Sequence, residues 1–176
     1  MIEHLPDMID AGIDSLKVEG RMKTALYVAT VARAYRKAID DYFEDPKRFE
    51  ENKSWYLDQI SDGTYRQFTT GFFYGKPDEY AQIYDANTYI KTYTYLGTVE
   101  GMDADGCIVL TQKNKFCVGD EIEIMKPDGE NIAVTVRSIR DDEGNEMESA
   151  PHPKQKLHVD IGMPAEKLDI LRQAAE

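Results

Sequence analysis

The chain has 176 residues, of which 41% are hydrophobic and 31% charged, and its 33 acidic and 21 basic side chains give a net charge of −12. This composition excludes a disordered protein, and the length allows one domain or two small ones. No run of about 18 apolar residues occurs and the first ten residues hold three carboxylates and a proline, so the sequence predicts neither a membrane span nor a signal peptide but a cytoplasmic protein.

The N-terminal residues predict a short helix followed by a strand. Residues 4–12 suit a helix because Pro6 stands in the first turn and Gly12 just past the end. Residues 13–18 alternate apolar and polar side chains with the period of a strand, and an acidic residue and a glycine end this run.

Two helices are expected next. Apolar side chains recur at three- and four-residue steps over residues 24–42, which predicts an amphipathic helix. An aspartate followed by a proline then stops this helix and starts a second one over residues 46–60. Two oppositely charged pairs one turn apart are expected to form ion pairs on the first helix: Arg36 with Asp40, and Lys37 with Asp41.

Helix, strand and helix form the repeating unit of α/β proteins, in which a parallel strand has neighbours on both sides. No other such unit is visible, so residues 13–18 would leave backbone N–H and C=O groups unpaired. We therefore expect this segment to pair with another element, to pair with a second copy in a homodimer, or to join a helix. We also expect the chain to be the end of a longer protein, with Met1 not its natural start.

The second half of the sequence changes character. Residues 64–84 form an aromatic-rich connector broken by glycine and proline. Residues 164–174 suit either a short helix or an extended tail. Short strands between Asp-Gly-type turns predict a small antiparallel β-barrel, and they are expected at residues 93–100, 107–111, 121–125, 132–139 and 157–161.

Most of the negative charge lies in this second part. Residues 1–48 hold 8 basic and 9 acidic side chains, whereas residues 49–176 hold 13 and 24. Phosphate contacts need lysine and arginine, so a nucleic-acid contact would require a local basic patch. The basic cluster predicted for the barrel consists of Lys113, Lys115 and Lys126.

Four stretches carry a resemblance to a known family: Ile2–Lys23, Tyr27–Asp40, Phe68–Pro77 and Asn114–Glu123. In this order they closely resemble the C-terminal third of the collagenase-like peptidase family U-32. The resemblance implies three parts: residues 1–45 as the last strand and helix of a TIM-barrel-like catalytic domain, 46–80 as a helix and aromatic-rich linker, and 81–176 as the family's C-terminal β-barrel. The expected fold class is an α/β remnant followed by a small, mainly antiparallel β-barrel, α+β overall.

The resemblance also implies what such a protein does. Many members are described as putative proteases, while others resemble RNA-hydroxylation proteins that act on wobble uridine of tRNA or on ribosomal RNA, depend on prephenate and are linked to an iron–sulfur cluster. The cysteines for such a cluster lie upstream in the family's catalytic domain, and Cys107 and Cys117 match none of them. We therefore expect no cofactor and no metal in this chain. The expected partners are the upstream catalytic domain and a protein or RNA substrate.

The turn after the predicted strand is the main candidate binding site. Glu19, Arg21 and Lys23 stand between the carboxyl end of that strand and a helix, which in (β/α) barrels is the catalytic face and often holds phosphate. The two cations suit an RNA phosphate or the carboxylate of a prephenate-like acid. The plainer alternative is that they pair with neighbouring acidic side chains.

No catalytic residue is assigned from the remaining motifs. His4, His152 and His158 are scattered, with His152 expected in a loop and His158 in a strand, and no Ser or Cys stands in a nucleophile elbow.

The aromatic connector has two interpretations. Aromatic residues next to glycine suit a platform for stacking bases, but more often they fill the seam between two domains, and we favour the seam. The residues concerned are Phe68, Phe72, Phe73 and Tyr74.

Two functions of different class follow. The chain is either part of a U-32 peptidase, with the barrel as an accessory substrate-binding or interaction domain, or part of an RNA-hydroxylation enzyme mislabelled as a peptidase. In both cases the piece alone is expected to be an interaction module without activity.

Overall fold

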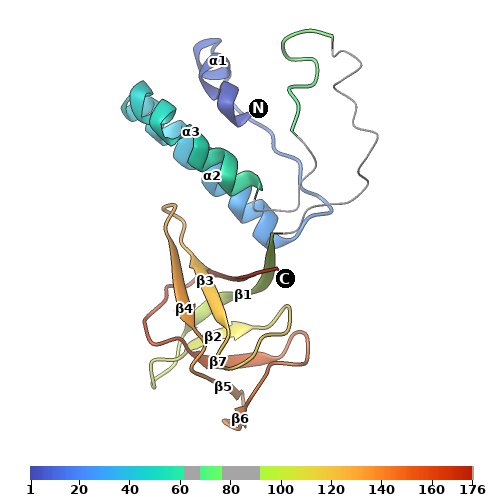
Figure 1. Cartoon of the computed structure of the whole chain (residues 1–176), viewed down its shortest axis with the longest axis vertical. Helices are drawn as coiled ribbons and strands as arrows, with labels where there is room; N and C mark the ends of the chain where they lie inside the picture. Colours follow the sequence, from blue (N-terminus) through green and yellow to red (C-terminus); the bar gives the residue numbers. More distant parts are fainter. Residues whose placement is uncertain (62–67, 77–91, 176) are drawn as a thin grey trace. The chain divides into compact units, whose positions relative to one another are not determined.

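The computed structural model describes residues 1–61, 68–76 and 92–175. The chain divides into two compact units, Met1–Thr92 and Tyr93–Glu176, here called the helical unit and the β unit (Figure 1). Together they give an α+β chain, as expected. The predicted boundary near residue 80 lies outside the described residues.

The helical unit is built on a pair of packed helices. A short 3-10 turn η1 (Ile2–His4) leads into α1 (Leu5–Asp10), and α2 (Ala25–Glu44) packs along α3 (Pro46–Ser61). The hydroxyl of Tyr42 on α2 donates to Asp10 of α1 over 2.8 Å. The core of the unit combines apolar side chains from all four elements: Ile2, Leu5, Met8, Val31, Ala34, Ala38, Phe49, Tyr56 and Ile60.

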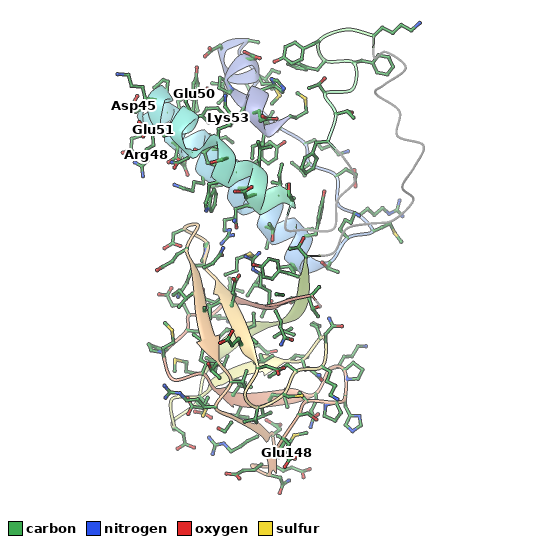
Figure 2. All side chains as sticks on the ribbon, viewed as in Figure 1. Asp45, Arg48, Glu50, Glu51, Lys53 and Glu148 are labelled. Carbon is green, nitrogen blue, oxygen red and sulfur yellow. The ribbon has the colours of Figure 1, made fainter. Side chains whose placement is uncertain are left out.

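Local signals explain where the long helices begin and end. The hydroxyl of Thr24 accepts a hydrogen bond from the N–H of Tyr27 at 3.2 Å, which caps α2. Asp45 ends α2 in an extended conformation, and its carboxylate accepts from the N–H of Lys47 at 3.0 Å at the start of α3. Figure 2 labels Asp45 and its charged neighbours on the first turns of α3. Both helices confirm the sequence prediction.

Asp41 is the buried polar centre of this helix pair. Its carboxylate accepts from the Tyr56 hydroxyl at 2.6 Å and from the Asn52 amide at 2.9 Å, and Lys37 and Arg48 lie 3.2 Å away. Burial alone raises the pKa of Asp41, but the hydrogen bonds from Tyr56, Asn52 and Lys37 outweigh it and hold this pKa below its ordinary value. The predicted Lys37–Asp41 pair is therefore part of a buried network.

The predicted surface pair of α2 is also present. The guanidinium of Arg36 donates from Nε to Asp40 at 3.0 Å, and both side chains are exposed. Such a pair in water contributes little to stability.

The predicted strand over residues 13–18 is wrong. These residues have no regular secondary structure, and most of them are exposed. The backbone of residues 14–19 forms no hydrogen bond with another described residue. A strand depends on a partner's N–H and C=O groups, and the described residues offer this segment none. The TIM-barrel remnant therefore has no support in the structure, and pairing with another element or a second copy stays a prediction.

The β unit is one antiparallel sheet of eight strands. Its order is β4-β3-β8-β1-β2-β7-β5-β6, and the sheet curls into a half-barrel rather than closing, because the edge strands β4 and β6 do not pair with each other (Figure 1). The strands are β1 (Tyr93–Met102), β2 (Ile108–Thr111), β3 (Glu121–Met125), β4 (Asn131–Thr135), β5 (Ser138–Asp141), β6 (Glu146–Met147), β7 (Lys156–Asp160) and β8 (Ile170–Ala174).

Three strand predictions needed correction. The single strand expected at 132–139 is two strands, since the chain turns at Val136 and Arg137, whose N–H groups donate to Asp120 and Asp160 instead of continuing one ladder. The short strand β6 was not predicted. The helix-or-tail segment 164–174 ends in β8, which lies between β1 and β3 in the sheet.

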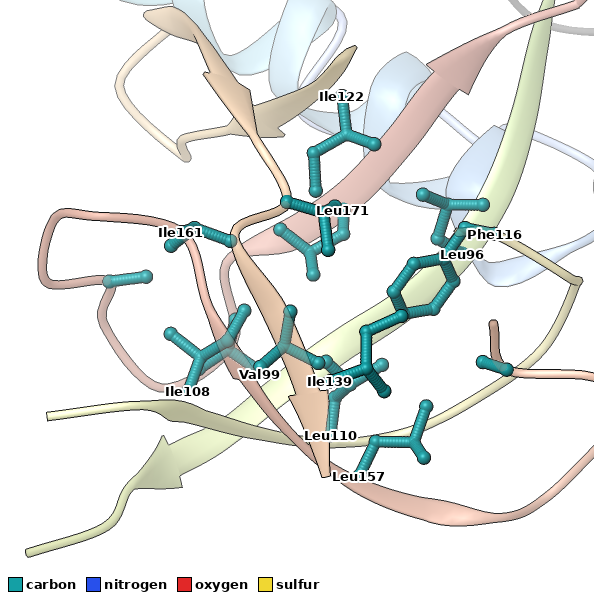
Figure 3. Close-up of a cluster of buried hydrophobic side chains, with 14 of the residues drawn as sticks. Leu96, Val99, Ile108, Leu110, Phe116, Ile122, Ile139, Leu157, Ile161 and Leu171 are labelled. Carbon is teal, nitrogen blue, oxygen red and sulfur yellow. The ribbon is translucent and has the colours of Figure 1, made fainter. Parts of the chain in front are cut away.

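The core of the β unit lies inside the curl of the sheet. Side chains from several strands point into this core. Among them are Leu96 of β1, Leu110 of β2 and Leu171 of β8 (Figure 3). Phe116, between β2 and β3, is the largest apolar side chain of this core and is 1% exposed. A sheet with an apolar inner face and a polar outer face explains how this unit buries a core despite its acidity.

Candidate functional site

The turn predicted to bind an anion lies directly before α2. The N–H of Lys23 donates to the Gly20 carbonyl at 2.9 Å, which closes the turn. The carboxylate of Glu19 lies 3.7 Å from the ammonium of Lys17, and both groups are exposed. The ammonium of Lys23 lies over the ring of Tyr27, 5.5 Å from its centroid. The plainer expectation, in which acidic neighbours neutralise Arg21 and Lys23, stays a prediction.

Arg21 is the exposed member of this turn. No described residue forms an ion pair or hydrogen bond with its guanidinium. However, the turn does not follow a strand, because residues 13–18 have no regular secondary structure. What supports an anion site here is an exposed guanidinium at the beginning of a 20-residue helix.

The described part of the connector forms a second candidate site, here called the aromatic turn (Phe68–Lys76). The hydroxyl of Tyr74 donates to the carboxylate of Asp7, and it lies 3.0 Å from Nδ1 of His4. The rings of His4 and Tyr74 also meet edge to face, with centroids 4.9 Å apart. We call these three residues the tyrosine clasp, because they join the aromatic turn to η1 and α1.

The hydrogen bond to Asp7 changes the chemistry of Tyr74. It raises the pKa of Tyr74 to about 12, with burial and the negative charge of Asp7 acting in the same direction. Tyr74 is therefore a neutral donor at physiological pH. Phe68, Phe72 and Phe73 are 47%, 79% and 45% exposed. The seam predicted for these aromatic residues stays a prediction.

An apolar groove occupies another face of the helical unit. It encloses about 610 Å³ between residues 13–18 and α2. Its lining is mainly apolar and comes from α1, the segment that follows it, and α2: Met8, Ile9, Ile13, Asp14, Ser15, Leu16, Val18, Ala32, Tyr35, Arg36, Ile39 and Phe43. The upstream domain expected as a partner would cover this kind of surface, and that partner stays a prediction.

The β unit carries a charged cluster on its outer face, which sequence reasoning missed. The His158 ring lies 2.7 Å from the carboxylate of Asp103, and this hydrogen bond holds the pKa of Asp103 below its ordinary value. Arg140 donates to Asp105 at 3.0 Å and to the sulfur of Cys107 at 3.3 Å. His158 and Arg140 are paired across β7 and β5, so the cluster ties the β1–β2 hairpin to these strands.

The described residues do not place a serine or cysteine nucleophile beside a histidine base. Within residues 1–61, 68–76 and 92–175, no histidine side chain hydrogen-bonds a serine, threonine or cysteine. His152 is exposed in a loop and His158 lies in β7, as predicted. A nucleophile needs a base within hydrogen-bonding reach, so the described residues do not support hydrolysis by Ser or Cys.

Neither the two cysteines nor the three lysines of the predicted basic cluster form a recognisable binding site among the described residues. Cys107 is buried and Cys117 half-buried, and both are free. Among the described residues, no group of three or more His, Cys, Asp or Glu side chains is arranged to hold a metal ion. Lys126 lies 2.7 Å from the carboxylate of the buried Asp169, which offsets its charge, whereas Lys113 and Lys115 are exposed. No helix in the described part of the chain is long and apolar enough to span a membrane.

The fold and these sites define an α+β protein with a helical unit and a β unit. The family model described as peptidase family U32 matches residues 1–83, and that of the peptidase family U32 C-terminal domain matches residues 91–172. The chain belongs to peptidase family U32, which confirms the resemblance seen in the sequence.

Several curated relatives are similar to the chain. "tRNA hydroxylation protein P1" of Bacillus subtilis is 44% identical over 88% of this chain and 37% of its own length. "tRNA hydroxylation protein P" of Escherichia coli is 32% identical over 85% of this chain and 32% of its own length. "Collagenase" of Porphyromonas gingivalis is 30% identical over 79% of this chain and 39% of its own length. The chain thus spans about a third of the length of these relatives.

A solved structure is also similar to part of the chain. The C-terminal domain of a Geobacillus thermoleovorans putative U32 peptidase is 32% identical, with a TM-score of 0.42, and the match covers 46% of this chain and 99% of that one.

Proposed function

We propose that this chain is the C-terminal part of a tRNA-hydroxylating enzyme rather than of a peptidase. The observation that supports this most is the 44% identity, over 88% of the chain, to a relative named tRNA hydroxylation protein P1. The relative named collagenase is 30% identical over 79% of the chain. The peptidase function therefore stays the second candidate, supported at the level of the family.

The geometry of the described residues agrees with this choice. Hydrolysis through a covalent intermediate needs a Ser, Thr or Cys next to a base, and no histidine of the described part hydrogen-bonds such a side chain. The described residues of this chain therefore favour a role other than peptide hydrolysis.

The iron–sulfur cluster linked to RNA-hydroxylating relatives does not fit this chain. Clusters of this kind are held by about four ligands, usually cysteine thiolates, whereas the chain has two cysteines. Cys107 is buried beside Arg140, and Cys117 lies in the same β unit. Any such cluster must be bound elsewhere.

The role proposed for this chain is binding rather than chemistry. Arg21, exposed at the turn before α2, would contact an anionic group, either an RNA phosphate or a carboxylate of an acidic co-substrate. The β unit, acidic and with a complete core, would act as an accessory domain that contacts substrate or other parts of the protein. The chain alone is then an interaction module.

The test is nucleoside mass spectrometry of tRNA. An Escherichia coli strain lacking its tRNA hydroxylation protein P receives the full gene that encodes this chain, in the natural, Arg21→Ala or Lys47→Ala form. Lys47 is a matched control because it is exposed and lies outside the turn. We expect the natural gene and Lys47→Ala to restore a hydroxylated uridine and Arg21→Ala to restore less, at an unchanged melting temperature. An unchanged nucleoside profile with the natural gene would favour the peptidase.

A further inference from the structure

The aromatic turn is a short, well-defined element within the connector. The N–H of Phe73 donates to the Thr70 carbonyl at 3.1 Å, and the N–H of Gly75 donates to the Phe72 carbonyl at 3.2 Å. Two glycines, at residues 71 and 75, have φ values of +55° and +139°, which residues with a side chain rarely adopt. The backbone therefore makes two consecutive tight turns, with Phe72 between them.

The tyrosine clasp holds this element on the rest of the helical unit. Tyr74 is fixed by Asp7 and by His4, which lie 67 and 70 residues away in the chain. The ring of Phe73 meets the ring of Tyr74 nearly at right angles, with centroids 4.9 Å apart. Tyr74 thus anchors the turn, and Phe73 packs against Tyr74.

Phe72 projects from this anchored turn into solvent. It is 79% exposed, against 71% for Phe43, the next most exposed phenylalanine among the described residues. Neighbouring exposed apolar side chains that form a contiguous patch can mark an interaction site. A preorganised exposed ring also loses little conformational freedom on binding.

The chemistry of the turn favours a nucleobase as the bound group. Every apolar side chain in Phe68–Lys76 is aromatic, with no Leu, Ile, Val or Met. Flat rings stack on any base, whereas surfaces that bind apolar protein segments usually combine aromatic with aliphatic side chains. Lys76, exposed at the end of the turn, supplies a positive charge for the adjacent phosphate, and the carboxylate of Asp7 is occupied by Tyr74.

We propose that the aromatic turn binds single-stranded RNA by stacking an unpaired base on Phe72, with Lys76 contacting the backbone and Tyr74 acting as a positioning residue. This inference rests on the proposed function, for which it names a contact with substrate. It differs from the seam interpretation in requiring that Phe72 be free to meet a ligand.

The direct test measures RNA binding by the 176-residue chain. The probe is a fluorescein-labelled, uridine-rich single strand of roughly 12 nucleotides, a length within the site sizes of small single-strand binders, followed by fluorescence anisotropy. We expect Phe72→Ala to weaken binding by about 5- to 150-fold, the range for removing one stacking ring. Phe72→Trp should retain affinity. Phe43→Ala, which removes another highly exposed ring on α2, should leave the affinity unchanged.

The salt dependence separates stacking from charge. Phe72→Ala should leave the slope of log affinity against log salt unchanged, whereas Lys76→Ala should reduce it by about 0.7, the value for one phosphate contact on a single strand. Absence of binding by the natural chain, equal loss in Phe72→Ala and Phe43→Ala, or equal binding of the duplexed probe would each overturn the proposal. A fall in melting temperature with Phe72→Ala, without loss of affinity, would overturn it in favour of the seam.

The nucleoside assay distinguishes this inference from the proposed function. If the natural gene restores the hydroxylated uridine and the Phe72→Ala gene restores as much, the function stands and the stacking proposal fails. If the natural gene restores none while Phe72→Ala still weakens RNA binding by the chain, the function fails and the stacking proposal stands.

Discussion

The helical unit and the β unit differ in how completely they bury their apolar side chains. Among the described residues, nine exposed large apolar side chains lie in the helical unit and three in the β unit. Ile13 and Val18 are nearly half exposed, and both line the groove beside α2. The helical unit therefore keeps apolar surface available for contacts, whereas the β unit is close to self-sufficient.

The difference follows from where each unit finds its backbone partners. Every strand of the β unit pairs with another strand of the same unit, so its hydrogen bonds and its core form together. Residues 13–18 have the sequence of a strand but no described partner, and they stay irregular. An apolar alternating pattern thus specifies a face to be buried, and a strand forms only where a neighbouring strand is present.

The largest effect on stability is expected from a cavity in the core of the β unit, and it tests whether the two units unfold independently. Replacing Phe116 with Ala should lower the free energy of unfolding of that unit by about 3–5 kcal/mol, the usual cost of removing a buried ring. The only tryptophan, Trp55, lies in the helical unit and reports on that unit alone. Urea unfolding followed by Trp55 fluorescence should stay unchanged, while amide hydrogen exchange in β2 and β3 accelerates. An equal shift of the fluorescence transition would show a single cooperative unit.

A smaller effect is expected at Asp41, the polar centre of the helical unit. Asp41→Ala leaves the buried donors of Tyr56 and Asn52 without an acceptor and should cost roughly 2–4 kcal/mol, read from Trp55 fluorescence. Asp40→Ala is the matched control, because Asp40 is exposed and pairs with Arg36 at the surface, and its loss should cost at most about 0.5 kcal/mol. Similar losses in both variants would contradict the assigned network.

The network at Asp41 also predicts a pH dependence. Because the folded-state pKa of Asp41 lies below its ordinary value of 3.8, its contribution is present above that pH and is lost as the pH falls through the folded-state pKa. The acid unfolding of the helical unit should therefore be less steep in Asp41→Ala than in the natural chain.

Features with local causes could be predicted from the sequence. The helices over 25–44 and 46–61 follow from apolar periodicity, a threonine cap and an Asp-Pro junction, all within a few residues. Several strands of the β unit were predicted because Asp-Gly turns mark their ends. The failures involve distant partners: β8 is a strand because β1 and β3 lie on either side of it, more than forty residues away in the chain.

The candidate sites show the same limit. The sequence singled out the residues of the turn before α2 and of the aromatic turn, but not the contacts that define them. The tyrosine clasp joins Tyr74 to residues near the N-terminus, and the outer cluster of the β unit joins His158 to Asp103, 55 residues apart. An interval of that length gives no periodic signal, so neither pairing could be found by spacing alone.

The smallest effect concerns the tyrosine clasp and appears only at alkaline pH. The folded-state pKa of Tyr74, about 12, lies above its ordinary value of 10.0 because its hydroxyl donates to Asp7. The stability from this hydrogen bond is therefore complete below pH 10 and is lost as the pH rises through 12. Tyrosinate absorbance is measured against pH for the natural chain and for Tyr74→Phe, and the difference between the two curves is the titration of Tyr74 alone.

A matched variant tests the cause of the shift. Asp7→Asn keeps an acceptor for the Tyr74 hydroxyl but removes the negative charge, so the Tyr74 titration should move back toward its ordinary value. At a fixed neutral pH, hydrogen exchange at Phe73 and Gly75 should be faster in Tyr74→Phe than in the natural chain, since both N–H groups lie in the aromatic turn that the clasp holds. A Tyr74 that titrates at its ordinary pH in the natural chain would mean that the aromatic turn is not held by Asp7, and Phe72 would lose the preorganised position that its proposed stacking role requires.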